Sequence, residues 1–139
     1  FQAFNLIPTL TAKDNIVLPL KMAKRTADPD WFDHVVAMLG LQDRLTHKPA
    51  ELSGGQQQRV AVARALITQP DIIFADEPTG ALDQATSASL IRFLRRLTDE
   101  LNQTLVMVTH DAAVAKWADR IVELRDGSIA RDIVARPVN

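Results

Sequence analysis

Two stretches of the chain carry residue types that can do chemistry on a phosphate. Residues 52–59 read Leu-Ser-Gly-Gly-Gln-Gln-Gln-Arg. A glycine-containing helix start there would let backbone N–H groups approach an anion closely. Asp76 and Glu77 follow an apolar run at residues 72–75. Asp76 suits magnesium, which takes one or two carboxylates beside phosphate oxygens, and Glu77 suits the deprotonation of an attacking water.

A third candidate, His110, follows a second apolar run at residues 104–108. Ligands of open α/β sheets bind beyond the carboxyl ends of the strands, so we expect Asp76, Glu77 and His110 to share one sheet edge. His110 could then donate a hydrogen bond to a terminal phosphate. Taken singly, an acidic pair after a strand is usually a solvated turn and a lone histidine is usually structural. The agreement of two strands with the glycine-containing segment favours a site.

The segments that must position these residues alternate between strand and helix patterns. Ser53 begins a helix, and Gln56 three residues later matches a capping box. Asp83 can cap a long helix whose leucines at 90, 94, 97 and 101 form one stripe. The alternation predicts βαβ units with a parallel sheet, and we expect residues 71–75 and 104–108 to be buried strands. Residues 121–124 and 129–134, joined at Asp126-Gly127, are expected to form a hairpin at one edge.

The region before Ser53 is expected to be helical and irregular. Residues 9–22 look like a loop leading into a short helix that Pro19 interrupts. Asp28 and Pro29 predict a helix start, and Gly40 predicts its end. Residues 41–51 read as a polar connector with a short helical piece.

Composition limits the classes of protein that remain. The 139 residues suffice for one domain with a core, and 47% hydrophobic with 24% charged residues is ordinary for a globular protein. A net charge of -1 gives no basic footprint for nucleic acid, so we expect no nucleic-acid partner. The absence of cysteine excludes disulfides and thiolate zinc sites. Without an apolar run of about 18 residues or a signal peptide, a soluble cytosolic domain is expected.

Five segments resemble motifs of ABC-type ATPases, in family order across the whole chain. Residues 52–59 resemble the signature motif, and residues 72–78 resemble the Walker B motif with its catalytic glutamate. Residues 81–83 resemble the D-loop, residues 109–111 the switch histidine, and residues 1–2 the Q-loop. Gly80 stands where many relatives carry serine, a departure with no clear functional penalty. Five motifs in order argue against chance similarity.

The resemblance implies an α/β fold of the P-loop NTPase type, a parallel sheet flanked by helices with an α-helical subdomain. Residues 9–51 would form that subdomain, and residues 52–139 the signature helix and α/β core. ATP and Mg²⁺ are the implied cofactors. Glu77, His110 and Gln2 are the implied catalytic residues, with Asp76 and Gln2 at the magnesium. The implied nucleotide contacts, made to ATP on the opposite subunit, are Ser53, Gly54, Gly55, Gln56 and Asp83. Gln57, Gln58 and Arg59 are expected to face the subunit interface or solvent.

The pattern of a phosphate-cradling loop, Gly-x₄-Gly-Lys-Ser/Thr, does not occur in these 139 residues. In the family this Walker A loop precedes the Q-loop, so it would lie before Phe1. Because the sequence also opens on Phe1 inside an apolar stretch, we expect that an N-terminal part is absent, with processing or trimming as the alternative. We therefore expect the intact protein to hydrolyse ATP and these residues alone to be inactive.

Residues 1–12, 18–20 and 74–83 resemble the lipoprotein-releasing and macrolide-efflux subfamily. The resemblance implies two partners, a second ATPase subunit and a transmembrane permease, with the protein held at the inner face of the cell membrane. Trp31, Phe32 and Met38 either contact the permease or pack in the core. Two other interpretations stay open: a soluble ABC ATPase without transport, and a catalytically inert, truncated binding module.

Overall fold

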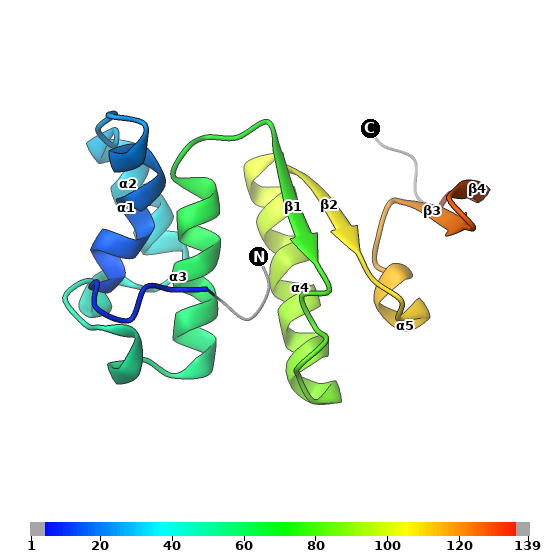
Figure 1. Cartoon of the computed structure of the whole chain (residues 1–139), viewed down its shortest axis with the longest axis horizontal. Helices are drawn as coiled ribbons and strands as arrows, with labels where there is room; N and C mark the ends of the chain where they lie inside the picture. The colour runs from blue at the N-terminus through cyan, green and yellow to red at the C-terminus, as the bar shows by residue number, and fades with distance from the viewer. Residues whose placement is uncertain (1–4, 136–139) are drawn as a thin grey trace. The chain divides into compact units, whose positions relative to one another are not determined.

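The computed structural model describes residues 5–135. Its internal contacts divide the chain into two compact units, and the boundary in the sequence lies between Ile73 and Phe74. The first unit is helical, and the second holds strands and helices (Figure 1). Gln2 lies outside the described residues. Within residues 5–135, no helix has both the length and the apolar character that a membrane crossing requires.

The first unit contains α1 (Ala12–Met22), α2 (Pro29–Met38), the 3₁₀ turns η1 (Gln42–Arg44) and η2 (Pro49–Glu51), and α3 (Gly54–Leu66). Both α1 and α2 pack on α3 (Figure 1). The apolar faces of the three helices form the core of this unit. Its most deeply buried apolar side chains are Ile16, Val35, Leu39, Leu41, Val60, Val62 and Leu66.

The two ends of α2 are the ones that the sequence predicts. Asp28 Oδ1 accepts hydrogen bonds from the backbone N–H groups of Asp30 (2.9 Å) and Trp31 (3.3 Å). At the other end Gly40 has φ +66°, and the N–H of Leu41 donates to Val36 O at 3.0 Å. A left-handed residue that closes the last turn in this way stops a helix, and glycine adopts it without steric cost.

The loop leading into a short helix that is predicted for residues 9–22 is found, since α1 begins at Ala12. The prediction that Pro19 interrupts this helix is wrong, because α1 continues through Pro19 to Met22. Thr11 caps the helix by accepting from Asp14 N at 3.2 Å. Ile16 and Leu20 are buried on either side of the proline position. The stabilisation from burying this face outweighs the loss of the one backbone hydrogen bond that a proline removes. A rule based on local sequence counts that loss but does not include the tertiary contacts.

The second unit contains the end of β1 (Ile72–Asp76), then α4 (Gln84–Leu101), β2 (Thr104–Val108), α5 (Ala112–Ala115), β3 (Arg120–Arg125) and β4 (Ser128–Val134). β1 and β2 pair and point in the same direction (Figure 1), so the predicted parallel α/β arrangement is confirmed. The leucine stripe of α4 is also confirmed: Leu90, Leu94 and Leu97 are buried and Leu101 is half-buried.

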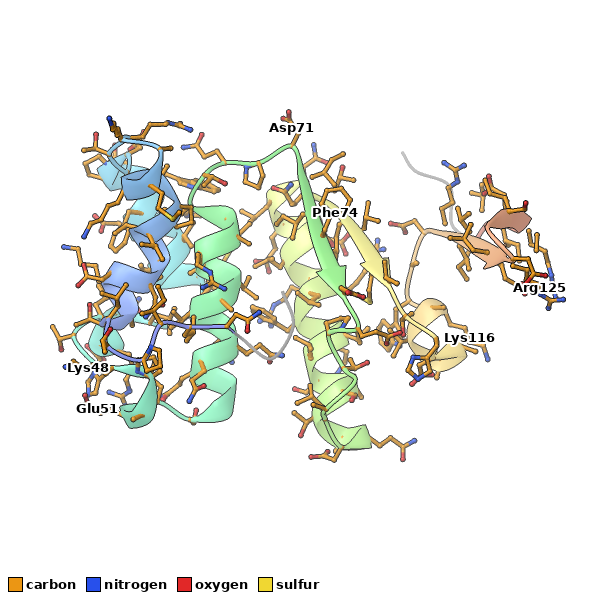
Figure 2. The ribbon with its side chains drawn as sticks, viewed as in Figure 1. Lys48, Glu51, Asp71, Phe74, Lys116 and Arg125 are labelled. Carbon is orange, nitrogen blue, oxygen red and sulfur yellow. The ribbon has the colours of Figure 1, made fainter. Side chains whose placement is uncertain are left out.

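The prediction of two fully buried strands is wrong for the residues that the structure describes. Ala75 is buried, but Phe74 is 66% exposed (Figure 2), and on β2 Val106 and Val108 are 40% and 57% exposed. Successive side chains of a strand point to opposite faces. An apolar run in the sequence shows that both faces of a strand can be buried. Which face is buried depends on the elements that pack against the strand.

The strands β3 and β4 form the predicted antiparallel hairpin, with Arg125 opposite Ser128 and Arg120 opposite Val134. Asp126 and Gly127 both have positive φ, 49° and 75°, as the tightest hairpin turns require. The hairpin is, however, a two-stranded sheet of its own among residues 5–135, so its predicted place at an edge of the parallel sheet is not found. A turn motif determines which two strands pair in the hairpin. It does not determine whether a third strand pairs with them.

Trp31 connects α2 to α3, which favours its core interpretation. Its side chain is half-buried, and Nε1 donates to Leu66 O at 3.0 Å. We expect Trp31→Phe to lower the free energy of unfolding by about 1 kcal/mol, because the substitution removes one hydrogen bond and little apolar area. Urea unfolding followed by circular dichroism measures this change.

Trp117→Phe is the matched control, because no indole hydrogen bond is seen for Trp117 among the described residues and its side chain is 39% exposed. Equal unfolding energies for the two variants would show that the bond to Leu66 contributes nothing.

Candidate nucleotide-hydrolysis site

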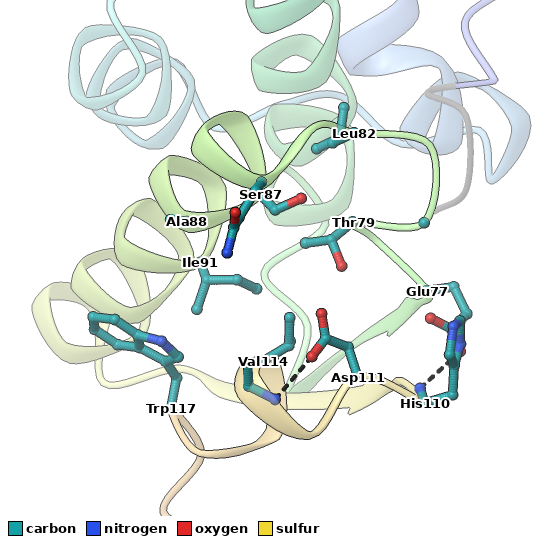
Figure 3. A pocket seen from close by; sticks show the side chains of 13 residues that line it. Glu77, Thr79, Leu82, Ser87, Ala88, Ile91, His110, Asp111, Val114 and Trp117 are labelled. Carbon is teal, nitrogen blue, oxygen red and sulfur yellow. Dashed lines mark hydrogen bonds and ion pairs between the residues drawn. The ribbon is translucent and has the colours of Figure 1, made fainter.

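The carboxyl ends of β1 and β2 are joined through Glu77. Its backbone N–H donates to Val108 O at 2.8 Å, and this bond pairs the end of β1 with the end of β2. The Glu77 carboxylate then reaches the residue that follows β2: Oε1 accepts from His110 N at 3.0 Å and lies 2.7 Å from His110 Nδ1 (Figure 3). The predicted meeting of Glu77 and His110 at one sheet edge is therefore confirmed.

A tight turn aims Glu77. Its φ is +44°, a left-handed conformation that is uncommon for a residue other than glycine. Glu77 O accepts from Gly80 N at 3.0 Å, and the turn buries Thr79. A Cβ at Gly80 would lie 3.4 Å from Glu77 O, an ordinary van der Waals contact. The turn therefore has room for the serine that the resemblance leads one to expect at this position.

The contact with Glu77 favours the charged form of His110. The hydrogen bond to the Glu77 carboxylate is the largest cause that raises the pKa of His110, and the negative charges of Glu77 and Asp111 act in the same direction. A protonated imidazole has two N–H donors. With Nδ1–H committed to Glu77, a charged His110 still presents Nε2–H, and its side chain is 86% exposed. This arrangement can bind an anion while it orients a carboxylate.

Asp76, the last residue of β1, is exposed beside this pair. No group of three or more histidine, aspartate or glutamate side chains that could hold a metal is found within residues 5–135. A single carboxylate nevertheless fits Mg²⁺, which commonly takes one or two carboxylates and fills its other positions with phosphate oxygens and waters. The second predicted magnesium ligand, Gln2, lies outside the described residues.

The start of α3 has the predicted capping box. Ser53 Oγ accepts from Gln56 N at 3.1 Å, and Gln56 Oε1 accepts from Ser53 N at 2.9 Å. Both bonds use side-chain acceptors, so the Ser53 hydroxyl hydrogen and the Gln56 NH₂ group stay available as donors. A Cβ added at Gly54 or Gly55 would meet nothing within 4 Å, which leaves their backbone open to an approaching group. The helix start thus presents free donors, as an anion requires.

Gln57 is a residue that the sequence analysis misplaced. Its Nε2 donates to Pro49 O at 2.9 Å and to Leu52 O at 3.3 Å, so its amide turns back onto its own chain and not into solvent. The expectation that it faces a subunit interface stays a prediction. The two bonds tie η2 to the first turn of α3. No local signal shows this role, because it depends on the chain folding back at η2.

Asp83 is confirmed as the cap of α4. Its Oδ1 accepts from Thr86 N and its Oδ2 from the Thr86 hydroxyl, both at 2.8 Å. These bonds, the backbone one first, lower the pKa of Asp83 and keep it ionised. Its contact across a subunit interface stays a prediction.

A pocket of about 500 Å³ lies within the second unit, between residues of α4 and α5 (Figure 3). Glu77 and His110 line one part of it, and Ile91, Val114 and Trp117 line another. Glu77 therefore borders a space that water can enter, as a general base that acts on water requires.

Comparison with known proteins decides the family. Residues 1–80 match the family model described as ABC transporter. The chain belongs to the ABC transporter family. It is 48% identical over 131 residues to the lipoprotein-releasing system ATP-binding protein LolD of Syntrophotalea carbinolica, covering 93% of this chain and 58% of the relative. It is 49% identical over 133 residues to the macrolide export ATP-binding/permease protein MacB of Syntrophobacter fumaroxidans, covering 93% of this chain and 19% of that protein.

A solved structure agrees with this assignment. The dimeric post-hydrolysis state of the ATP-binding cassette MJ0796 bound to ADP and Pi aligns with a TM-score of 0.73 at 44% identity. The alignment covers 99% of this ABC chain and 62% of that chain. MJ0796 is a protein of Methanocaldococcus jannaschii. The chain thus spans less than two thirds of the relatives it matches, and the predicted ABC cassette fold is confirmed over that span.

The contact between Glu77 and His110 predicts a pH dependence. The pKa of His110 in the folded chain is raised above the ordinary value of about 6.5. The charged His110 therefore stabilises the folded chain fully below about pH 6.5, and this stabilisation is lost as the pH rises through the raised pKa. We expect Glu77→Gln to lower the His110 pKa. NMR titration of the imidazole Cε1–H signal measures it.

Glu123→Gln is the control for this titration, because Glu123 pairs with Arg125 and Arg131 in the hairpin. An unchanged His110 titration in Glu77→Gln would show that the two side chains do not interact in solution.

Proposed function

We propose that this chain is part of an ATP-binding and ATP-hydrolysing subunit that powers a partner membrane permease of the export or lipoprotein-release type. The observation that carries the proposal is the contact of Glu77 with His110 at the carboxyl ends of two parallel strands, 2.7 Å between Oε1 and Nδ1. This pair joins an oriented carboxylate to an anion-binding imidazole. Family membership makes ATP the phosphate compound on which the pair acts.

In the proposed reaction Glu77 is the general base. Both bonds from His110 use Oε1, which leaves Oε2 to take the proton from the attacking water. His110 holds the carboxylate in place through Nδ1 and presents Nε2–H to the terminal phosphate. Charge that develops on that phosphate is stabilised best by donors already in position, and the turn at Glu77 fixes both residues before the substrate arrives.

The signature segment supplies donors to the same phosphate from a second copy. Ser53, Gly54, Gly55 and Gln56 would bind the γ-phosphate of ATP held by the partner, and Asp83 would contact that partner. Head-to-tail pairing of two copies with two-fold symmetry provides this arrangement. The dimeric state of the MJ0796 cassette supports the pairing. Asp76, with Gln2, would hold Mg²⁺, which when bound neutralises phosphate charge.

The permease partner and the position at the inner face of the membrane are part of the same proposal. The relatives' names include a lipoprotein-releasing system, macrolide export and bacitracin export. Because these names differ in cargo while their ATP-binding parts are similar, we assign the cargo to the permease and none to this chain.

The role of Glu77 is tested by Glu77→Gln in the complete reading frame that encodes this sequence. The glutamine oxygen can still accept from His110, but the amide cannot take up a proton at neutral pH. We expect Mg-ATP turnover to fall about 10²- to 10⁴-fold, the usual contribution of a general base, while binding of a fluorescent ATP analogue is preserved. Phosphate release and fluorescence titration measure the two quantities.

Glu100→Gln is the matched control, because Glu100 is exposed on α4 and its nearest cationic partner is Arg96 at 3.8 Å. A Glu77→Gln protein that hydrolyses ATP at the wild-type rate would remove Glu77 from the role of base.

Co-purification separates transport from the two interpretations without it. The proposal expects the tagged subunit to retain a membrane permease after detergent extraction. An active ATPase without a permease would instead be a soluble ABC protein, and a bound partner without hydrolysis would indicate an inert module.

A further inference from the structure

Two consecutive glutamines of α3 hold one peptide group just before the helix. The N–H of the peptide that joins Leu52 to Ser53 donates to Gln56 Oε1 at 2.9 Å. The carbonyl of the same peptide accepts from Gln57 Nε2 at 3.3 Å. A peptide group is planar, so bonds to both of its polar atoms fix its plane relative to α3. We call this peptide, with Gln56 and Gln57, the glutamine clamp.

The clamp is anchored on the turn η2. Gln57 Nε2 also donates to Pro49 O at 2.9 Å, so the two donors of its amide serve two carbonyls. Pro49 O accepts from Leu52 N at 3.1 Å as well, which closes η2. Glu51 Oε1 braces the same turn by accepting from Lys48 N at 3.2 Å. Gln57 therefore binds a turn that is held by bonds of its own.

The clamped peptide lies between the core and the surface of the first unit. Leu52 is 7% exposed, whereas the next three residues, 53–55, are exposed. Gln57 is half-buried, and a hydrogen bond that is partly shielded from water is stronger than one in water. The exposed residues of the signature segment thus start from a peptide whose orientation is set by the core and by the clamp.

The clamp determines where the free donors of the helix start point. The N–H groups of Gly54 and Gly55 belong to the first turn of α3, in which a helix offers no partner. Glycine has the greatest backbone freedom of all residues, so these two groups owe their direction to the peptide before them and the helix after them. Rotation of the peptide before Ser53 would turn the serine hydroxyl and both N–H groups away together.

We propose that Gln57 is a positioning residue that sets the direction of the signature donors before the partner's nucleotide arrives. It acts through the Leu52–Ser53 peptide and not by contact with the phosphate. Donors that are already in place need no reorganisation when charge develops on the phosphate. The proposal rests on the proposed function, because these donors matter only where the γ-phosphate of the partner's ATP is bound.

Hydrogen exchange in the complete reading frame tests the clamp without any need for activity. Gln57→Met keeps the length of the side chain and removes both donors. We expect the amides of Leu52 and Ser53 to exchange about tenfold faster in this variant, as loss of a hydrogen bond implies, and the last turns of α3 to stay unchanged. Gln42→Met is the matched control, because Gln42 is an exposed glutamine of the same unit. Wild-type exchange at Leu52 and Ser53 in Gln57→Met overturns the proposal.

Kinetics of the same protein test the effect on the site. We expect Gln57→Met to lower kcat about tenfold or more, as misdirected groups do, with the Kd of a fluorescent ATP analogue within about twofold of wild type. Gln57→Lys keeps a donor at this position and is expected to restore most of the turnover, which a loss of donors unrelated to position would not allow. If Gln57→Met does not fold, Gln57→Ala, which also lacks both donors and suits a helix, carries the same expectations.

Mixed dimers test whether the effect crosses to the partner's nucleotide. The reference dimer joins one wild-type subunit to one Glu77→Gln subunit, so its active site takes its base from the first and its signature donors from the second. Adding Gln57→Met to the Glu77→Gln subunit is expected to lower turnover about tenfold, and adding it to the other subunit to leave turnover unchanged. Equal losses in the two arrangements overturn the positioning role. Where the reference dimer is inactive, kcat of the homodimer decides alone.

The outcomes separate this proposal from the proposed function. Faster exchange at Leu52 and Ser53 with unchanged kcat overturns the positioning role of Gln57 and leaves the ATPase intact. A wild-type protein that never hydrolyses ATP overturns the proposed function, and with it the positioning role, while the exchange result still decides whether Gln57 holds the peptide.

Discussion

The hydrogen bond from Glu77 N to Val108 O is the constraint on which the chemistry of the second unit depends. It pairs the ends of β1 and β2, and so brings together Glu77 and His110, which are 33 positions apart. Parallel strands need a long crossover between them, here α4, and the buried leucine stripe of α4 provides the apolar packing of that crossover. A slip of one residue in this pairing would reverse the side-chain directions and separate the carboxylate from the imidazole.

Several residues of the candidate site have a structural role beside the chemical role that is proposed for them. Ser53 and Gln56 close the start of α3 with their acceptors and keep donors free. Asp83 is similar, since it caps α4 while it stays ionised. Because the same atoms hold a helix end and face the solvent, truncation at these positions changes stability as well as binding. Variants that keep the shape of the side chain, such as glutamine for glutamate, therefore give the clearer answer about chemistry.

Each unit prepares its own part of the chemistry by internal contacts. In the first unit, η2 is tied to the start of α3 by Gln57, and the Leu52–Ser53 peptide is held by Gln56 and Gln57. In the second unit, a left-handed turn at Glu77 sets the carboxylate beside His110. Groups that are in place before a substrate binds lose little entropy in the reaction, which is the general advantage of preorganised sites. The arrangement of the candidate site in this chain thus depends on a few polar hydrogen bonds as well as on the apolar cores.

The sequence by itself determined the features that are set by neighbours within a few residues. The capping box at Ser53, the proline start and glycine stop of α2, the stripe of α4, the hairpin turn at Asp126-Gly127 and the types of the site residues all follow from local spacing. Tertiary structure alone decided which strand faces are covered, that α1 continues through Pro19, and that Gln57 turns back to Pro49. The physical reason is the range of the interactions. A cap or a turn is stabilised by its own few residues, whereas burial and long-range hydrogen bonds depend on segments that meet only once the chain has folded.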